Sequence, residues 1–146
     1  MDAFGDWRYT VDRAATAAAY SRVSEGTAVR CGCSGCRNFI AVREQVLPRE
    51  FVSLLQKLGI DSAKDGVVYT EGAAAPGAHF YGGWYHFVGT LEVAGDFAPV
   101  EFSGGFISYM CKKSAPCLPE LDGLDLVQLE FRATNVPWVI PDEEPL

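Results

Sequence analysis

The sequence lacks any long hydrophobic run. No stretch approaches the roughly 18 consecutive apolar residues that a membrane-spanning helix needs. The first eleven residues carry Asp2, Asp6 and Arg8 where a secretory signal would have a basic start and an apolar centre. Both absences predict a cytoplasmic protein, and in that compartment its cysteines are expected to be reduced.

Basic residues are also scarce. Twelve lysines and arginines stand against nineteen aspartates and glutamates, which gives a formal charge of −7. Lys112 and Lys113 are the longest basic run. Because nucleic acids and anionic membranes both require a basic surface, neither is an expected partner. The acidic surface would suit a basic protein partner, and a second copy of the chain is the other partner considered.

Known catalytic motifs are missing as well. The chain has no GxSxG, no HExxH and no phosphate-binding loop, and its paired glycines do not stand between a strand and a helix. The sequence therefore names no reaction.

What is present is the composition of one globular domain spanning residues 1–146. Hydrophobic residues make up 49% of the chain and charged residues 21%. A chain of this length buries roughly 68 to 70% of its unfolded surface, so it needs no disulfides to form a core.

Helices are expected in the first part of the chain. Asp12 is placed to cap a helix over residues 12–20, and Ser34 one over residues 35–46. A third helix is expected from Pro48 to the terminating Gly59. Its apolar residues fall at i, i+3, i+4 and i+7: Phe51, Leu54, Leu55 and Leu58.

Strands dominate the rest. A short strand is expected at residues 27–30, and the sheet proper has its strands at residues 67–70, 84–93, 100–110 and 127–133 together with the residues before Gly82. The fold class is therefore α+β: an antiparallel sheet of about five strands with two or three helices on one face. Helices lie mainly in 12–60 and the sheet in 67–140, and the acidic residues 141–146 are expected to fray.

Cys31, Cys33 and Cys36 form a cysteine cluster, with three thiols in six residues. On a strand end, residues i and i+2 point the same way, and a turn can bring the third thiol to the same point. Thiolates are preferred zinc ligands, and a closed structural site needs four of them. Cys111 or Cys117 could complete it, and the histidines, His79 and His86, are the other candidates.

Two other interpretations of the cluster are open. The thiols could be free cysteines beside a tight turn. Alternatively, Cys33 and Cys36 form a CxxC pair at a helix start, which is the position of redox cysteines in thioredoxin-like enzymes. The absence of a βαβ pattern around it argues against that fold.

Aromatic residues flank Gly82 and Gly83, as in a hairpin with a two-residue turn. Alternation would then place four polar and aromatic side chains on one face of the hairpin, where they could line a ligand-binding cleft: His79, Tyr81, Trp84 and His86. The alternative is the half-exposed face of an ordinary sheet.

Four segments carry a resemblance to a family of small bacterial proteins of unknown function. They are CGCSGCRNF at residues 31–39, LGID at 58–61, YGGWYHFVG at 81–89 and VPWVI at 136–140. The resemblance covers residues 31–140. It implies a bacterial protein and brings no activity.

The CxCxxC pattern followed by Arg37 is also similar to the zinc-binding stretch of glutathione-dependent formaldehyde-activating enzymes. That likeness implies a zinc ion on Cys31, Cys33 and Cys36. The chain has no earlier CxC and no later CxxC, so the second zinc site of that family has no counterpart here.

Three functional hypotheses result. The first is a domain whose cysteine cluster binds zinc in a structural role. The second is a zinc-dependent enzyme with an open metal position and His79 or His86 as a proton carrier. The third is an acidic interaction module that uses the aromatic hairpin to bind a protein partner.

Overall fold

The protein is an α+β fold, as the sequence predicts. The computed structural model describes residues 1–142, 144 and 145. Four α-helices lie in these residues: α1 (Arg13–Ser21), α2 (Thr27–Cys31), α3 (Ser34–Val46) and α4 (Arg49–Leu58). The strands number seven where about five were expected: β1 (Asp2–Phe4), β2 (Trp7–Val11), β3 (Val67–Ala75), β4 (Ala78–Val93), β5 (Val100–Phe102), β6 (Phe106–Lys112) and β7 (Leu126–Pro137). Within the described residues, no helix is long and apolar enough to cross a membrane.

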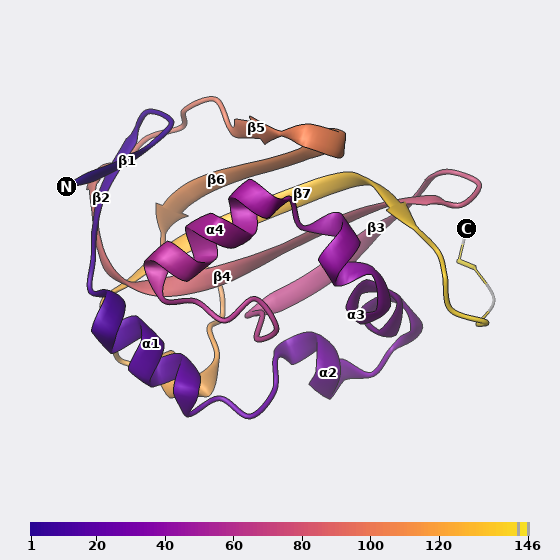
Figure 1. The fold of residues 1–146 in the computed structure, drawn as a ribbon, viewed down its shortest axis with the longest axis horizontal. Helices are drawn as coiled ribbons and strands as arrows, with labels where there is room; N and C mark the ends of the chain where they lie inside the picture. Colours follow the sequence, from indigo (N-terminus) through magenta and orange to yellow (C-terminus); the bar gives the residue numbers. More distant parts are fainter. Residues whose placement is uncertain (143, 146) are drawn as a thin grey trace.

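The sheet is antiparallel and strongly curved. Its strand order is β1-β2-β4-β7-β6-β5, and β3 pairs with the first half of β4. A Cβ on Gly5, in the β1–β2 turn, would lie 3.0 Å from Cγ2 of Val100 at the start of β5. The two ends of the strand order thus meet, and the sheet wraps around α4 (Figure 1).

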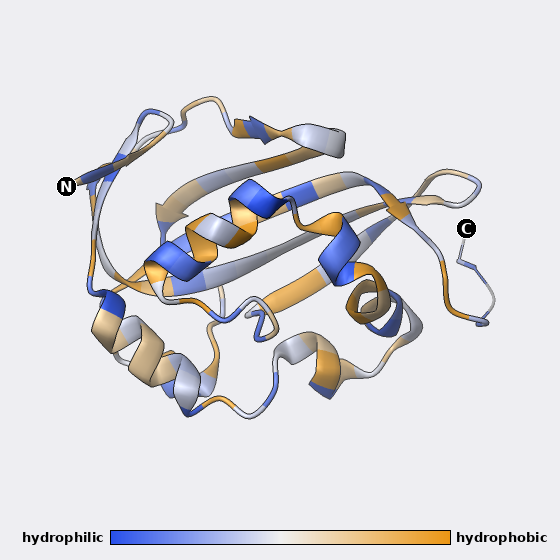
Figure 2. Ribbon diagram, viewed as in Figure 1, coloured by the Kyte–Doolittle hydropathy of each residue, from blue (hydrophilic) through white to orange (hydrophobic). Residues whose placement is uncertain are grey.

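Helix α4 has the predicted bounds because its signals are local. Gly59 adopts a left-handed φ of 85°, and the amide of Ile60 donates to the carbonyl of Leu55, as in a Schellman ending. Phe51, Leu55 and Leu58 are buried. Figure 2 shows hydrophobic and hydrophilic segments alternating along this helix, so one side of it faces the sheet.

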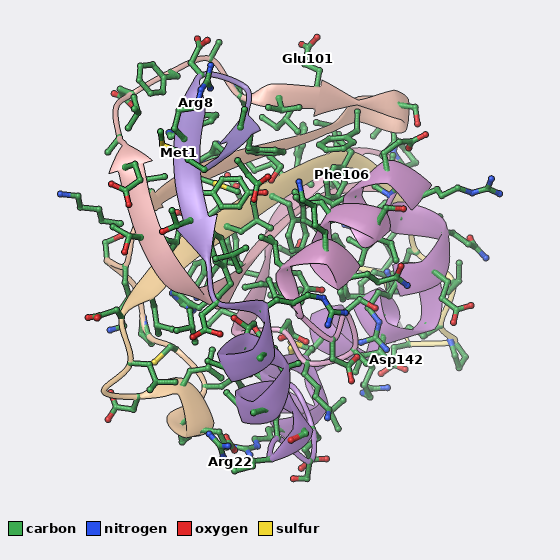
Figure 3. The ribbon with its side chains drawn as sticks, turned by 60° about the vertical axis from the view of Figure 1, so that its left-hand side comes forward. Met1, Arg8, Arg22, Glu101, Phe106 and Asp142 are labelled. Atoms are coloured by element: carbon green, nitrogen blue, oxygen red, sulfur yellow. The ribbon has the colours of Figure 1, made fainter. Side chains whose placement is uncertain are left out.

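The core between α4 and the sheet is aromatic. The ring of Phe51 lies 4.8 Å from that of Phe106, which stacks on Phe131 at 5.5 Å between centroids. Figure 3 shows Phe106 inside the curve of the sheet. Phe39 of α3 stacks on the same Phe131 at 6.0 Å, so α3 and α4 share one face of the sheet.

The predicted turn at Gly82 and Gly83 is wrong. Both residues lie inside the continuous strand β4, and the hairpin turn is at Pro76 and Gly77. The two glycines serve packing instead. A Cβ on Gly82 would collide with the ring of Tyr69, and one on Gly83 with the ring of Phe131 on the opposite face. The strand therefore needs glycine where aromatic rings cross it.

Other boundaries differ from the prediction. Residues 27–30 belong to helix α2 and not to a strand. Residues 72–75 continue β3, and the expected strand 100–110 is two strands joined by a turn at Ser103–Gly105. Strands β1 and β2 were not expected, although Trp7, Tyr9 and Val11 alternate with Arg8 and Thr10 along β2.

Helix α1 lies along the edge of β4, in the gap between β2 and β3. Asp12 caps it as predicted, accepting from the amide of Ala15. The hydroxyl of Thr16 accepts from the amide of Val88 at 2.9 Å, and the hydroxyl of Tyr20 donates to the carbonyl of His86 at 2.8 Å. Side chains of a helix thus satisfy strand backbone groups that no neighbouring strand reaches.

Candidate metal centre

The cysteine cluster lies at the junction of α2 and α3. Cys31 is the last residue of α2, and Cys33 caps the N-terminus of α3. Between them Gly32 adopts a left-handed φ of 67°, which reverses the chain and turns both thiols toward Cys36 in the first turn of α3. The strand geometry and the Ser34 cap expected here are wrong, but the predicted convergence of the three thiols is confirmed.

The three sulfur atoms lie within 4.8 Å of one another. Among the described residues, this is the only group of three or more cysteine, histidine or acidic side chains with its ligand atoms so close. Cys31 and Cys33 are exposed, while Cys36 is buried with 6% of its surface accessible. Three close thiols of this kind can hold a metal ion, and two of them are open to solvent.

Electrostatics at the start of α3 favour a thiolate. The amide of Cys36 donates to Sγ of Cys33 at 3.4 Å, and this hydrogen bond lowers the pKa of the Cys33 thiol. The helix N-terminus adds a positive potential at the same place. Burial raises the pKa of Cys36, and its thiol neighbours act in the same direction. Without a cation, the exposed Cys33 thiol ionises more easily than the buried Cys36 thiol.

The remaining cysteines lie elsewhere. Cys111 is on β6, where its thiol donates to Glu130 at 3.4 Å and burial raises its pKa to about 11. Cys117 is in the loop after β6 and packs partly buried against the core. Neither belongs to the group of close thiols. The structure therefore does not bring the two predicted completing cysteines to the cluster.

The four residues of the expected aromatic face also lie apart from one another in the structure. In the continuous strand, Tyr81 points toward α3 and donates to the carbonyl of Gly35 at 2.7 Å. Trp84 and His86 lie on the opposite face beneath the loop after β6, where Trp84 donates to the carbonyl of Pro116 at 3.0 Å. His79 is fully buried elsewhere, against Trp138. No common cleft joins these four residues, because the turn that would have aligned them does not exist.

His86 belongs to a buried network that the sequence did not indicate. Its Nε2 lies 3.0 Å from Oε1 of Gln128, which also accepts the amides of Ser114 and Ala115. An oxygen that already accepts two amides is an acceptor for the ring as well, so Nε2 carries the proton. Burial lowers the pKa of His86 and keeps the ring neutral. This network holds the loop to the sheet and extends through Glu130 to Cys111, but it does not include the cysteine cluster.

The residues that fix the first turn of α3 were also missed. The side chain of Asn38 is fully buried; its Nδ2 donates to the carbonyl of Pro137 at 2.9 Å, and its Oδ1 accepts from the amide of Val139 at 2.8 Å. The Arg37 guanidinium donates through Nε to the carbonyl of Gly32 at 3.0 Å. The sequence shows only an asparagine two residues after Cys36, and its burial is seen in the structure alone. Its contacts are about a hundred residues away in the sequence, so the pattern alone could not identify them.

Comparisons with protein-family models, with curated proteins and with solved structures found no match to this chain.

Proposed function

We propose that the protein binds a zinc ion through the thiolates of Cys31, Cys33 and Cys36. The observation that carries this proposal is the convergence of three sulfur atoms within 4.8 Å of one another. Zinc–sulfur bonds of about 2.3 Å in a tetrahedral site place the sulfurs roughly 3.8 Å apart. Small side-chain rotations of the two exposed cysteines are enough to reach that spacing.

The charges around the cluster fit such an ion. Three thiolates and one divalent cation leave a net charge of −1. The N-terminus of α3 offsets part of this charge, and the guanidinium of Arg37 lies beside the cluster, where it is also paired with Asp142. Arg30, one residue before Cys31, is a second neighbouring cation and pairs with Glu120 at 3.8 Å. These features support a thiolate site in a chain that is otherwise acidic.

The role that best fits the position is structural. The ion would join the end of α2 to the start of α3, where the connection is Gly32 and the capping Cys33, and a Cβ on Gly32 would have no atom within 4 Å. A cross-link at this short junction would stabilise the packing of α2 against α3, because metal binding then contributes directly to folding free energy.

The fourth coordination position would face solvent, because Cys31 and Cys33 are exposed. An open position is the property that separates catalytic from structural zinc sites. An open fourth position therefore supports a second candidate function, a zinc-dependent enzyme whose substrate would occupy that position. Neither His79 nor His86 is part of the cluster, so the proton carriers expected for such an enzyme would have to come from other residues.

The first experiment is elemental analysis of untagged protein purified without added metal, with a count of free thiols after denaturation. One zinc per chain supports the proposal. Cys33→Ser should abolish binding and lower the melting temperature. The matched control is Cys111→Ser, which lies outside the cluster and should keep full zinc content. Equal zinc in both variants, or no zinc in the wild type, would contradict the proposal.

The same preparation tests a dithiol function. Cys33 is exposed and easily ionised, and Cys36 is buried next to it, which is the arrangement of an attacking and a resolving thiol. If the protein carries no metal, and an added disulfide oxidises these two thiols to an intramolecular disulfide, the dithiol function replaces the zinc site.

A further inference from the structure

Residues 138–142, here termed the strap, follow β7 and return to the first turn of α3. Two consecutive residues of that turn hold the strap. Asn38 holds Val139 by the hydrogen bond described above. Arg37 donates through both terminal nitrogens to the Asp142 carboxylate, at 3.0 and 2.7 Å. Figure 3 shows Asp142 at the surface of the molecule. The strap is thus attached to the residues immediately after Cys36.

Arg37 connects the strap to the cysteine cluster directly. The same guanidinium that binds Asp142 donates to the carbonyl of Gly32, the residue between Cys31 and Cys33. The position of that carbonyl depends on the conformation of the α2–α3 junction. Any ligand that fixes Cys31 and Cys33 therefore also fixes one of the two anchors of the guanidinium.

The strap covers His79. The ring of Trp138 lies 5.3 Å from the imidazole, and Nε2 of His79 pairs at 2.6 Å with Glu144, just beyond the strap. The imidazole is fully buried, yet its Nδ1 has no hydrogen-bond partner. A buried nitrogen without a partner is unfavourable, and exposure to water would relieve it.

The Asp142 end of the strap is its weakly held end. The Arg37–Asp142 pair is exposed, with 46% and 35% of the side-chain surfaces accessible, and exposed pairs contribute little. The unpaired Nδ1 opposes docking. The buried hydrogen bonds of Asn38 hold the other end, so it is the Asp142 end that a small change at Arg37 can release.

We propose that metal occupancy of the cysteine cluster controls docking of the strap, so that the metal-bound protein buries His79 and the metal-free protein exposes it. This inference rests on the metal site proposed above. With metal, the junction holds the Gly32 carbonyl in place and Arg37 stays aligned with Asp142. Without metal, the junction relaxes, Arg37 loses its anchor, and the Asp142 end of the strap moves away together with Glu144, which uncovers Nε2 of His79. Coupling is reciprocal, so a docked strap raises the metal affinity.

The test uses the two histidines of the chain as probe and internal control. Diethyl pyrocarbonate modifies accessible imidazoles, and peptide mass spectrometry reports His79 and His86 separately. Both are buried, but His86 lies beneath the loop after β6, which Gln128 holds to the sheet and whose one ion pair toward the cluster region, Glu120 with Arg30 at 3.8 Å, is partly exposed. Removal of zinc by a chelator should accelerate labelling of His79 at least tenfold and leave His86 unchanged.

Three outcomes separate the possibilities. Faster labelling of His79 alone supports the inference. Unchanged labelling in a protein that demonstrably binds and loses zinc refutes the inference and leaves the metal site standing. Parallel acceleration at both histidines shows general unfolding and also refutes it. A protein that binds no metal fails at the earlier step, which elemental analysis detects on its own.

A substitution in the strap provides a second test of the coupling. Asp142→Asn removes the charged partner of Arg37 and leaves the cysteines intact. In zinc-loaded protein it should accelerate labelling of His79 and weaken zinc binding about three- to tenfold, measured by competition with a chromophoric chelator. Asp6→Asn is the matched control, because Asp6 is exposed in the β1–β2 turn and far along the chain from the cluster. Equal zinc affinity in the two variants would overturn the coupling.

Discussion

Replacing Gly83 with alanine should destabilise the protein substantially. A Cβ at this position would lie 2.5 Å from the carbonyl oxygen of Val67 and 2.8 Å from Cζ of Phe131. Neither neighbour can move freely, because the first is backbone of β3 and the second is a fully buried ring. Overpacking of a core costs about 1–3 kcal/mol of unfolding free energy. Because Gly83→Ala must also displace a paired strand, we expect its loss at the upper end, about 2–3 kcal/mol.

Gly82→Ala is the matched comparison. The methyl group there meets the ring of Tyr69, which is only partly buried and can rotate toward solvent. Neither Gly82 nor Gly83 has a positive φ, so alanine brings no backbone strain at either position. We expect a loss below about 1 kcal/mol for Gly82→Ala, as for other substitutions that a surface side chain can absorb.

Urea unfolding measures the difference if both variants keep the wild-type dependence on denaturant. In a chain of 146 residues, 2–3 kcal/mol corresponds to a fall in melting temperature of roughly 4–12 °C. If the two glycines formed a tight turn, both would need positive φ and both variants would lose similar stability. Equal losses, or no loss for Gly83→Ala, would refute the packing argument.

Further predictions concern protonation, the strap anchor and thiol reactivity. Burial lowers the pKa of His86, so the folded protein binds this proton less well than the unfolded chain does; the unfolding free energy should fall as pH drops below about 6.5. Denaturant titrations between pH 7.5 and 5.5 check this, and His86→Asn should have the shallower slope. Asn38→Ala leaves the carbonyl of Pro137 and the amide of Val139 without their partner, and should cost about 1–3 kcal/mol and speed proteolysis after residue 137. Slower or unchanged cleavage would contradict that anchor. In metal-free protein, iodoacetamide should modify Cys33 well before Cys111, because one thiol has a lowered pKa and the other a raised one. The reverse order by peptide mass spectrometry would contradict the assigned environments.

The parts of the fold that the sequence predicts are those set by local signals. Helix α4 needs only its apolar spacing and Gly59, and the cap of α1 needs only Asp12. Strand β7 alternates between apolar and polar residues over positions 127–133 and was found for the same reason, although the polar Gln128 is buried. Each of these signals comes from residues that lie close together in the sequence.

The errors arise where distant contacts decide the structure. The glycine pair is typical of a turn, but Tyr69 and Phe131 determine its role, and they come from strands on either side of β4. Likewise, nothing local indicates that Arg37 and Asn38 bind residues 137–142. The cysteine cluster was predictable because its spacing is short, and Cys111 failed as a ligand because β6 pairs it against Gln128 and Glu130.

The position of α1 beside β4 has a consequence for association between molecules. Unpaired backbone groups at a strand edge attract strands of other chains. Here Thr16 and Tyr20 occupy the edge groups of His86 and Val88 that β2 and β3 leave open. If α1 detached, two backbone sites in the middle of the longest strand would become available to a neighbour. The helix therefore protects the sheet against intermolecular pairing, and variants that weaken it should aggregate before they lose the rest of their fold.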